Sequence, residues 1–376
     1  MTVADKPLAA IWNGAGSFDL IDQTVPEPGP GDVVLQVGAA GICGSDLFFL
    51  GVRNELDPVP VGHEVVGTVI AAGRDVRRLA EGDRVAVEMV GLSRACMSCW
   101  FCRRGEYVKC TDKQERRGGG FASYMCVPAH ACFAVPDSLT WEQAALVEPL
   151  AVSVHAVRLS EARSYETAVV LGAGTIGLTC VAALSAMGVR DILVTARHPH
   201  QAEMAKRLGA SEVVEAESED GWLAASEGAT GRGADTAVPE GGSPLLDLVH
   251  ELTEERGADV VFECVGGTSG ASLAQAIFTT RKTGRIVSVG GQKNPIPFST
   301  VGMLQRELRL IMSHCYAVID GSHDYEVSID ILESGVPPIA NLVTHRYGLS
   351  EINEAFALAG DKTSGSLKVQ LVGGTG

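Results

Sequence analysis

The sequence has no long uninterrupted hydrophobic stretch and no excess of positive charge. No segment reaches the run of about 18 apolar residues that a membrane-spanning helix needs. The N-terminal residues MTVADKPLAAIWNGAG do not combine a basic region with an apolar one, as a secretory signal does. The formal net charge of −16 argues against nucleic acid or an anionic membrane as a partner. We therefore expect a cytoplasmic protein whose acidic surface serves solubility.

The ten cysteines do not follow the pattern of a small secreted disulfide framework. The run CMSCWFCRRGEYVKC contains Cys96, Cys99, Cys102 and Cys110. Thiolates so close in sequence can surround one soft tetrahedral ion, and Zn²⁺ is the usual occupant of four sulfurs. A bacterial ferredoxin-type run has its last Cys after three intervening residues and then Pro. Here seven residues separate Cys102 from Cys110, and Thr111 follows, so an iron–sulfur cluster is disfavoured. Unligated thiols are the third alternative, and we predict a closed structural zinc site.

The chain length of 376 residues predicts two domains, because one hydrophobic core stops growing below this size. Residues 1–156 show short β-like runs between Gly, Pro and Asp turns. Residues 157–299 alternate strand and helix patterns, which indicates βαβ units and a parallel sheet. Residues 300–376 end in the strand-like LKVQLV and could complete the first domain. Within the second stretch, the acidic and Gly-rich residues 211–256 predict a surface excursion that buries little.

A glycine-rich motif opens the βαβ stretch. ETAVVLGAGTIGL places Gly172, Gly174 and Gly177 after a strand and at the start of a helix, the context in which GxGxxG indicates dinucleotide binding. Gly172 allows a tight turn, Gly174 lets the backbone approach a pyrophosphate, and Gly177 permits close packing of the helix. Thr175 and Ile176 complete the loop at the helix N-terminus, whose N–H groups face the phosphates. The alternative is a strand-to-helix turn without a ligand.

The following strand decides between the two nicotinamide dinucleotides. An NAD-binding unit carries Asp or Glu about 20 residues beyond the glycines, where the carboxylate binds the ribose 2′-OH. Here Ala196 and Arg197 occupy the end of the strand. A guanidinium attracts a 2′-phosphate, so the sequence favours NADP(H) over NAD(H), with His198, His200 or Arg207 as possible helpers. A solvated Arg after a strand is the alternative.

A second candidate metal set lies in the β-rich stretch. Cys43 occurs in GICGSD, His63 and Glu64 occur in GHEVVGTVIAAG, and Glu148 occurs in VEPLAVSVHA. Each residue alone has an ordinary explanation as a buried Cys, a satisfied His or a surface Glu. Together they would make an open catalytic zinc site with a position for water or substrate.

These motifs occur in the order found in medium-chain zinc-dependent alcohol dehydrogenases, which the chain resembles throughout its length. GHEVVGTVIAAG is similar to the family signature, and GDRV at 82–85, the four-Cys run, VEPLAVSVHA and LGAGTIGL follow in register. The sorbitol/polyol and 2,3-butanediol dehydrogenase branch is the most similar. The resemblance implies an α/β protein with a GroES-like catalytic domain, an inserted doubly wound Rossmann domain, and assembly as a dimer or tetramer.

The resemblance also implies the roles of individual residues. Cys43 and His63 are expected to bind the catalytic zinc, and Glu64 and Glu148 to ligate it directly or through water. Zinc at such a site lowers the pKa of an alcohol, whose hydride passes to nicotinamide. In the same family pattern Ser45 is the hydroxyl that passes the proton. Asp46 is the carboxylate that orients the zinc-binding His, although ordinary loop capping is the alternative for both residues.

Two departures from the family narrow the expected chemistry. Phe48 stands where many members continue the proton relay with His, and with Phe49 and Leu50 it predicts a less polar pocket mouth. Cys315 stands where sorbitol dehydrogenases carry a polyol-binding Arg, while Tyr316 matches, so sorbitol is disfavoured. We predict an NADP(H)-preferring enzyme for a secondary alcohol and its ketone. The alternatives are an NAD-dependent polyol dehydrogenase and a non-catalytic nucleotide-binding zinc protein.

Overall fold

The computed structural model describes residues 6–52, 55–115, 117–228, 238–296 and 300–373, without the side chains of 49–50 and 227–228. The chain forms two compact units. Unit 1 comprises Met1–Ala151, Cys315–Gly335 and Ile339–Gly376, and unit 2 comprises Val152–His314 and Val336–Pro338. Among the helices of the described ranges, none combines the length and apolar character that crossing a bilayer requires.

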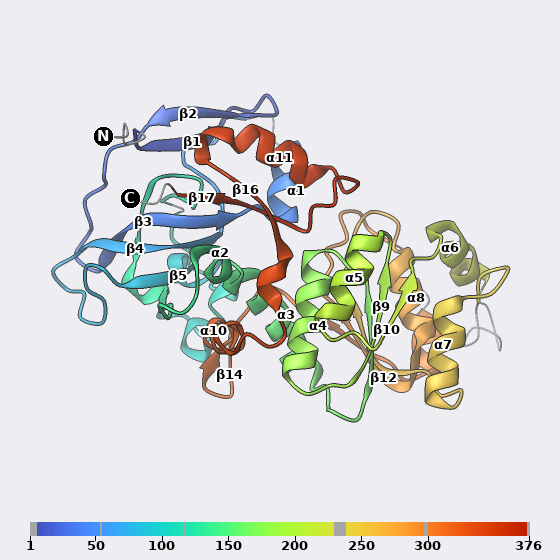
Figure 1. Ribbon diagram of the computed structural model, residues 1–376. Coiled ribbons are helices and arrows are strands. Elements are labelled where there is room, and N and C mark those ends of the chain that lie inside the picture. The colour runs from blue at the N-terminus through green and yellow to red at the C-terminus, as the bar shows by residue number, and fades with distance from the viewer. Residues whose placement is uncertain (1–5, 53–54, 116, 229–237, 297–299, 374–376) are drawn as a thin grey trace. The chain divides into compact units, whose positions relative to one another are not determined.

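Unit 1 is built around a seven-stranded sheet in which β6 also pairs with β3 (Figure 1). Its long strand β3 is paired on both sides and buried at nearly every position, and its side chains Val33, Leu35 and Val37 belong to the main core of the unit. The aromatic rings of Phe18, Phe121 and Phe356 meet in the core, where α11 packs against β17. The strands are β1 (Leu8–Trp12), β2 (Phe18–Asp22), β3 (Asp32–Gly41), β4 (Glu64–Ala72), β5 (Arg84–Glu88), β6 (Tyr124–Pro128), β7 (Cys132–Ala134), β14 (Val318–Ile319), β15 (Ser322–His323), β16 (Val343–Tyr347) and β17 (Lys368–Val372). The helices are α1 (Gly44–Val52), α2 (Trp141–Ala144), α10 (Asp324–Ser334) and α11 (Ile352–Gly360), and α3 (Val147–Ser160) begins in unit 1 and continues into unit 2.

Unit 2 is a parallel six-stranded sheet with the order β10-β9-β8-β11-β12-β13. Numbered along the chain, these strands follow the order 3-2-1-4-5-6 of a doubly wound dinucleotide-binding sheet, which confirms the predicted fold class. Figure 1 shows α4 and α5 on one face and α7 and α8 on the other, so β8 is buried along its whole length. The strands are β8 (Thr167–Leu171), β9 (Asp191–Ala196), β10 (Glu212–Glu215), β11 (Ala258–Glu263), β12 (Thr280–Ser288) and β13 (Arg309–Met312). The helices are α4 (Thr175–Ala186), α5 (Pro199–Arg207), α6 (Glu219–Gly228), α7 (Pro244–Thr253), α8 (Ala271–Thr279) and α9 (Thr300–Gln305).

The acidic segment after α5 differs from the expected surface excursion. It contributes β10 to the sheet and forms α6 and α7, and the side chains of Trp222 and Leu245 are buried. The carboxylate of Glu217 accepts hydrogen bonds from Trp222 Nε1 and Ser243 Oγ, each at 2.7 Å, and from the Leu245 N–H at 3.1 Å. The prediction that this segment buries little is therefore wrong for its described part, while 229–237 lie outside the described residues.

Candidate metal and cofactor sites

Three residues of unit 1 bring possible metal ligands together. Cys43 precedes α1, His63 directly precedes β4, and Glu64 is the first residue of β4. Cys43 Sγ, a ring nitrogen of His63 and a carboxylate oxygen of Glu64 all lie within 4.8 Å of one another. Thiolate, imidazole and carboxylate are the donors that an open zinc site uses, so the chemistry of this set fits Zn²⁺.

Asp46 holds two of these ligands in place. Its Oδ2 accepts a hydrogen bond of 2.9 Å from the Cys43 N–H, and its Oδ1 lies 3.4 Å from His63 Nδ1. Burial opposes a charged imidazole, but the Asp46 carboxylate and the Cys43 sulfur together raise the pKa of His63 well above its ordinary value. A metal that binds here must therefore displace a proton.

Helix α1 carries the residues expected along the proton's route. Ser45 is half-buried in its first turn, and Phe48 is half-buried three residues later, which places both on one side of the helix. The side chains of Phe49 and Leu50 lie outside the described residues. On this side of the helix, the residue that comes after Ser45 is therefore Phe48, whose apolar ring cannot carry a proton.

Glu64 is held by a buried cation that the sequence patterns did not reveal. Lys368 Nζ donates to both carboxylate oxygens of Glu64 at 2.7 Å and to the carbonyl oxygen of Ile42 at 3.1 Å. Gly41 lies opposite Glu64 in the β3–β4 ladder, where a Cβ would stand 1.9 Å from the carboxylate. The Glu64 carboxylate therefore fits only because residue 41 is glycine, and its counter-charge comes from Lys368 at the start of β17.

Glu148 lies near this set but is not part of the group within 4.8 Å. It is buried in the first turn of α3, and burial raises its pKa to about 7, with His63 opposing and Glu64 adding to the shift. Cys315 lies close enough for burial and the charge of Glu148 to raise its pKa to about 12. The thiol of Cys315 is thus neutral where the family resemblance expects a guanidinium. Tyr316 next to it is fully buried.

The four cysteines of the lobe between β5 and β6 converge as predicted from their spacing. Cys96 Sγ and Cys102 Sγ are 4.0 Å apart, as are Cys99 Sγ and Cys110 Sγ. Zinc–sulfur bonds of about 2.3 Å separate tetrahedral sulfurs by about 3.8 Å, so the set fits one Zn²⁺. Backbone N–H groups of Cys102 and Thr111 lower the pKa of Cys99 to about 5, which favours the thiolate that a metal needs.

The glycine loop between β8 and α4 is shaped as its spacing predicts. Gly172 has φ +92°, and a Cβ on Gly177 would lie 1.8 Å from the carbonyl oxygen of Gly172. Gly174, in contrast, faces open space, and as the N-cap of α4 it offers no side chain to cap the first turn at Thr175 and Ile176. The open backbone at a helix N-terminus fits the phosphates of a dinucleotide.

The residues expected to select the cofactor are only partly brought together. Ala196 is buried at the end of β9, and Arg197 follows with a largely exposed side chain whose Nη2 lies 3.5 Å from Glu219 Oε1. His198 is the N-cap of α5. Arg207 ends the same helix, roughly 12 Å along its axis from the N-terminus, and its Nη2 lies 2.5 Å from Glu203. The structure thus places Arg197 and His198 together and Arg207 apart from them.

A second residue that the sequence analysis missed, the carboxylate of Glu263, supports the glycine loop. Glu263, fully buried at the end of β11, accepts hydrogen bonds from the N–H groups of Val265 and Gly266 and from Ser272 Oγ. Val265 is the side chain that a Cβ on Gly172 would meet. A Glu ending an apolar strand before two glycines is a local signal that could have identified it, whereas Lys368 and Glu64 are 304 residues apart.

Comparisons with known proteins agree with this geometry. The alcohol dehydrogenase GroES-like domain family matches residues 29–137, and the zinc-binding dehydrogenase family matches residues 175–334. Sorbitol dehydrogenase of Bacillus subtilis (strain 168) is 30% identical over 380 residues, covering 98% of this chain and 98% of that protein. The chain belongs to the medium-chain zinc-dependent alcohol dehydrogenases. The expected polyol branch and the GroES-like and Rossmann architecture are thereby confirmed.

Two solved structures are similar to this dehydrogenase over nearly its whole length. The 2R,3R-butanediol dehydrogenase of Bacillus subtilis superposes with a TM-score of 0.79 at 28% identity, covering 97% of this chain and 99% of that one. A zinc-binding dehydrogenase from Sinorhizobium meliloti 1021, solved with NADP bound, has a TM-score of 0.80 at 26% identity, with coverage of 98% and 99%.

Proposed function

We propose that this dehydrogenase transfers hydride between NADP(H) and a secondary alcohol or its ketone at a site formed by Cys43, His63 and a carboxylate. The observation that carries the proposal is the convergence of these ligands within 4.8 Å in a chain of the zinc alcohol dehydrogenase family. When bound, zinc would lower the pKa of the alcohol and nicotinamide would accept its hydride. Asp46 orients His63, and Ser45 Oγ accepts the proton of the substrate hydroxyl while its own proton passes on to solvent.

Both glutamates remain proposed partners of the metal. Glu64 is supported by its distance to Cys43 and His63, although Lys368 engages both of its oxygens. Glu148 is supported by its burial next to the same set. In this proposal one carboxylate ligates the metal directly and the other through water.

The zinc proposal predicts two ions per chain, one in each set. Replacing Cys43→Ser should lower the zinc content from two to one and abolish turnover, with the far-ultraviolet circular dichroism spectrum unchanged. Cys126→Ser is the matched control, because Cys126 belongs to neither set, and it should keep both ions and full activity. Full activity in metal-free Cys43→Ser protein would contradict the proposal.

The preference for NADP(H) is supported by Ala196, which removes the usual carboxylate, and by the exposed Arg197 beside it. The NADP-bound relative from Sinorhizobium meliloti agrees with it. Losing a charge-assisted contact in Arg197→Ala should raise the KM for NADPH by about tenfold or more relative to that for NADH. Arg207→Ala, at the far end of α5, is the matched control and should leave this ratio unchanged. Equal effects of Arg197→Ala on both cofactors reject the role.

The proposed substrate is a diol, ketone or related compound rather than sorbitol. The neutral thiol of Cys315 supports this, because it cannot offer the charge-assisted hydrogen bonds of a polyol-binding Arg. NADPH oxidation measured against ketones, diketones and keto-sugars tests it, with NADH run in parallel. Fastest turnover of fructose with NADH would identify a sorbitol-type enzyme instead.

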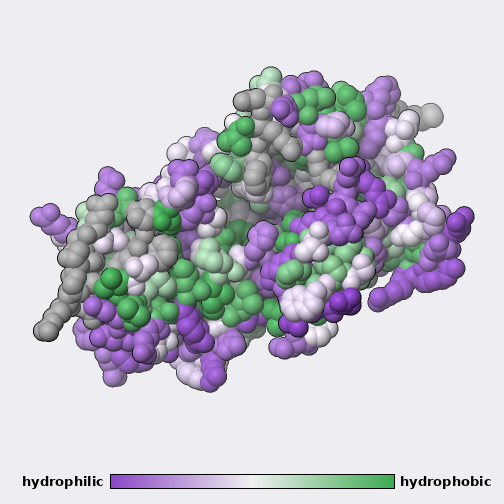
Figure 2. All heavy atoms as spheres, turned by 180° about the vertical axis from the view of Figure 1, so that it is seen from behind, coloured by the Kyte–Doolittle hydropathy of each residue, from purple (hydrophilic) through white to green (hydrophobic). Residues whose placement is uncertain are grey.

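We further propose that this dehydrogenase forms a homodimer or homotetramer in a reducing cytoplasm. Hydrophobic residues gather on part of the surface in Figure 2. The exposed large apolar side chains of unit 2 include Val301 and Leu304 on α9 and Met312 on the outermost strand β13. An outermost strand with apolar neighbours is a frequent site of self-association. The location is supported by the ten free cysteines.

A further inference from the structure

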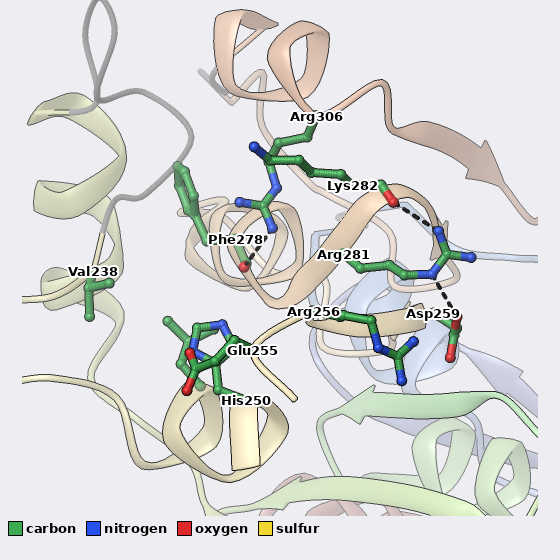
Figure 3. Close-up of a pocket in the computed structure, with 10 residues that line it drawn as sticks. Val238, His250, Glu255, Arg256, Asp259, Phe278, Arg281, Lys282 and Arg306 are labelled. Carbon is green, nitrogen blue, oxygen red and sulfur yellow. Dashed lines mark hydrogen bonds and ion pairs between the residues drawn. The ribbon is translucent and has the colours of Figure 1, made fainter. Parts of the chain in front are cut away.

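A hollow of about 690 Å³ lies in unit 2 at the amino ends of β11 and β12 (Figure 3). Its walls come from α7, from the turn that follows α7, and from the C-terminal end of α8. The glycine loop lies at the carboxyl end of β8 in the same parallel sheet. A six-residue strand such as β11 spans roughly 20 Å, so the hollow and the proposed phosphate site occupy opposite edges of the sheet.

The lining of the hollow carries a local excess of positive charge. Four of its ten residues are Lys or Arg, namely Arg256, Arg281, Lys282 and Arg306, whereas the whole chain has 30 among 376 residues and a net charge of −16. Its acidic side chains, Asp259 and Glu255, balance two of these charges, which leaves a net charge of +2 with His250 neutral. A cationic hollow in an acidic protein attracts small anions.

Two of the guanidinium groups are fixed by the protein itself. Arg281 Nε donates to Asp259 Oδ1 at 2.6 Å, and its Nη1 donates to the carbonyl oxygen of Lys282 at 2.8 Å. Asp259 is fixed in turn by the Thr167 N–H at 2.9 Å. Arg306 Nη2 donates to the carbonyl oxygens of residues 278 and 280. Because these side chains are ordered before any ligand arrives, binding would cost little side-chain entropy.

Arg256 is a further cation of the hollow and comes from the turn that follows α7. It lies in the turn after α7, where Glu254 and Glu255 both have positive φ, and its side chain is exposed. Within the described parts of the chain its guanidinium group makes no hydrogen bond or ion pair, so its five N–H donors face solvent at the rim. Figure 3 shows Arg256 and Arg281 on the same side of the hollow.

We propose that this hollow binds a small polyanion, either a phosphate ester or a polycarboxylate, separately from the cofactor. Guanidinium groups in a fixed arrangement bind phosphate and carboxylate oxygens in pairs, which suits a compact ligand with two or more anionic groups. The ring of Phe278 is only 3% exposed, so the site recognises charge and not an aromatic base. Surface cations that serve solubility alone would not be held by Asp259 and by backbone carbonyls.

Isothermal titration of the zinc-loaded protein at saturating NADP⁺ tests this proposal. Fructose 1,6-bisphosphate and tricarballylate serve as probes and distinguish phosphate from carboxylate chemistry. At least one should bind at one site per chain, and Arg256→Glu should weaken it by about tenfold or more through charge reversal. Arg190→Glu, an exposed charge reversal outside the hollow, should not.

The proposal is overturned if neither probe binds the wild-type protein, or if Arg256→Glu binds the probe as tightly as the wild type. Arg256→Ala provides a second variant, with weakening intermediate between the wild type and Arg256→Glu. The titration measures binding and not turnover, so its result does not depend on whether the proposed oxidoreductase reaction is correct.

Discussion

Among the ion pairs of the described residues, the pair formed by Lys368 and Glu64 in unit 1 is the most deeply buried. Both side chains are at most 2% exposed, and the ammonium group also bonds the carbonyl oxygen of Ile42. Burial alone would lower the pKa of Lys368, but the charge of Glu64 raises it, so the cation persists inside the protein. The pair therefore places a buried ammonium group beside the Glu64 carboxylate, next to Cys43 and His63.

Removing one member of this pair should be costly. Lys368→Met leaves the Glu64 carboxylate buried without its counter-charge, and we expect the free energy of unfolding to fall by about 3–5 kcal/mol. Urea unfolding followed by circular dichroism measures the change. The double variant Lys368→Met/Glu64→Gln is the control and should recover part of the loss. Equal destabilisation in the two variants would show that packing, not charge, is responsible.

At the scale of elements, two glycines in the turn from β8 to α4 have different roles. We expect Gly177 to be needed for folding and Gly174 to be needed for binding the dinucleotide. A Cβ on Gly177 would overlap the carbonyl oxygen of Gly172, whereas one on Gly174 would enter open space. Gly177→Ala should therefore reduce both the melting temperature and the affinity for the dinucleotide. Gly174→Ala should reduce only the affinity, because its methyl group occupies the expected path of the pyrophosphate. Thermal unfolding with and without NADP⁺ distinguishes them, and an equal loss of stability would refute this assignment.

Elements defined by local patterns were predictable, and those that depend on distant partners were not. The glycines at 172–177 follow an apolar strand and open a helix, so their conformation could be read from the sequence. The four cysteines of the lobe likewise lie within fifteen positions. The segment after α5 was wrongly predicted to bury little. Its acidic composition gave no indication that Trp222 is buried or that Glu217 accepts a hydrogen bond from it. No local pattern connects Lys368 with Glu64.

At the scale of the whole molecule, the two metal sets should contribute differently to stability. The lobe has a small apolar cluster of its own, formed around Ala95, Cys102 and Cys110, and so would depend on the proposed metal for order. The strands near Cys43 belong to a large core. Cys99→Ser should therefore lower the melting temperature more than Cys43→Ser, whereas Cys43→Ser should lower activity more. Differential scanning fluorimetry and turnover of zinc-quantified samples measure both, and the reverse order would contradict the assignment.

The sulfur atoms of the lobe also determine what would happen if a bound metal were lost. Pairs of them stand 4.0 Å apart, a small movement from the bond length of about 2 Å in a disulfide. Exposed to air, the emptied lobe would oxidise to paired cystines that can no longer accept an ion, whereas under thiol reductant it would reload. A zinc ion bound in this position would thus shield four cysteine sulfurs from oxidation, and the storage life of the purified protein would depend on it.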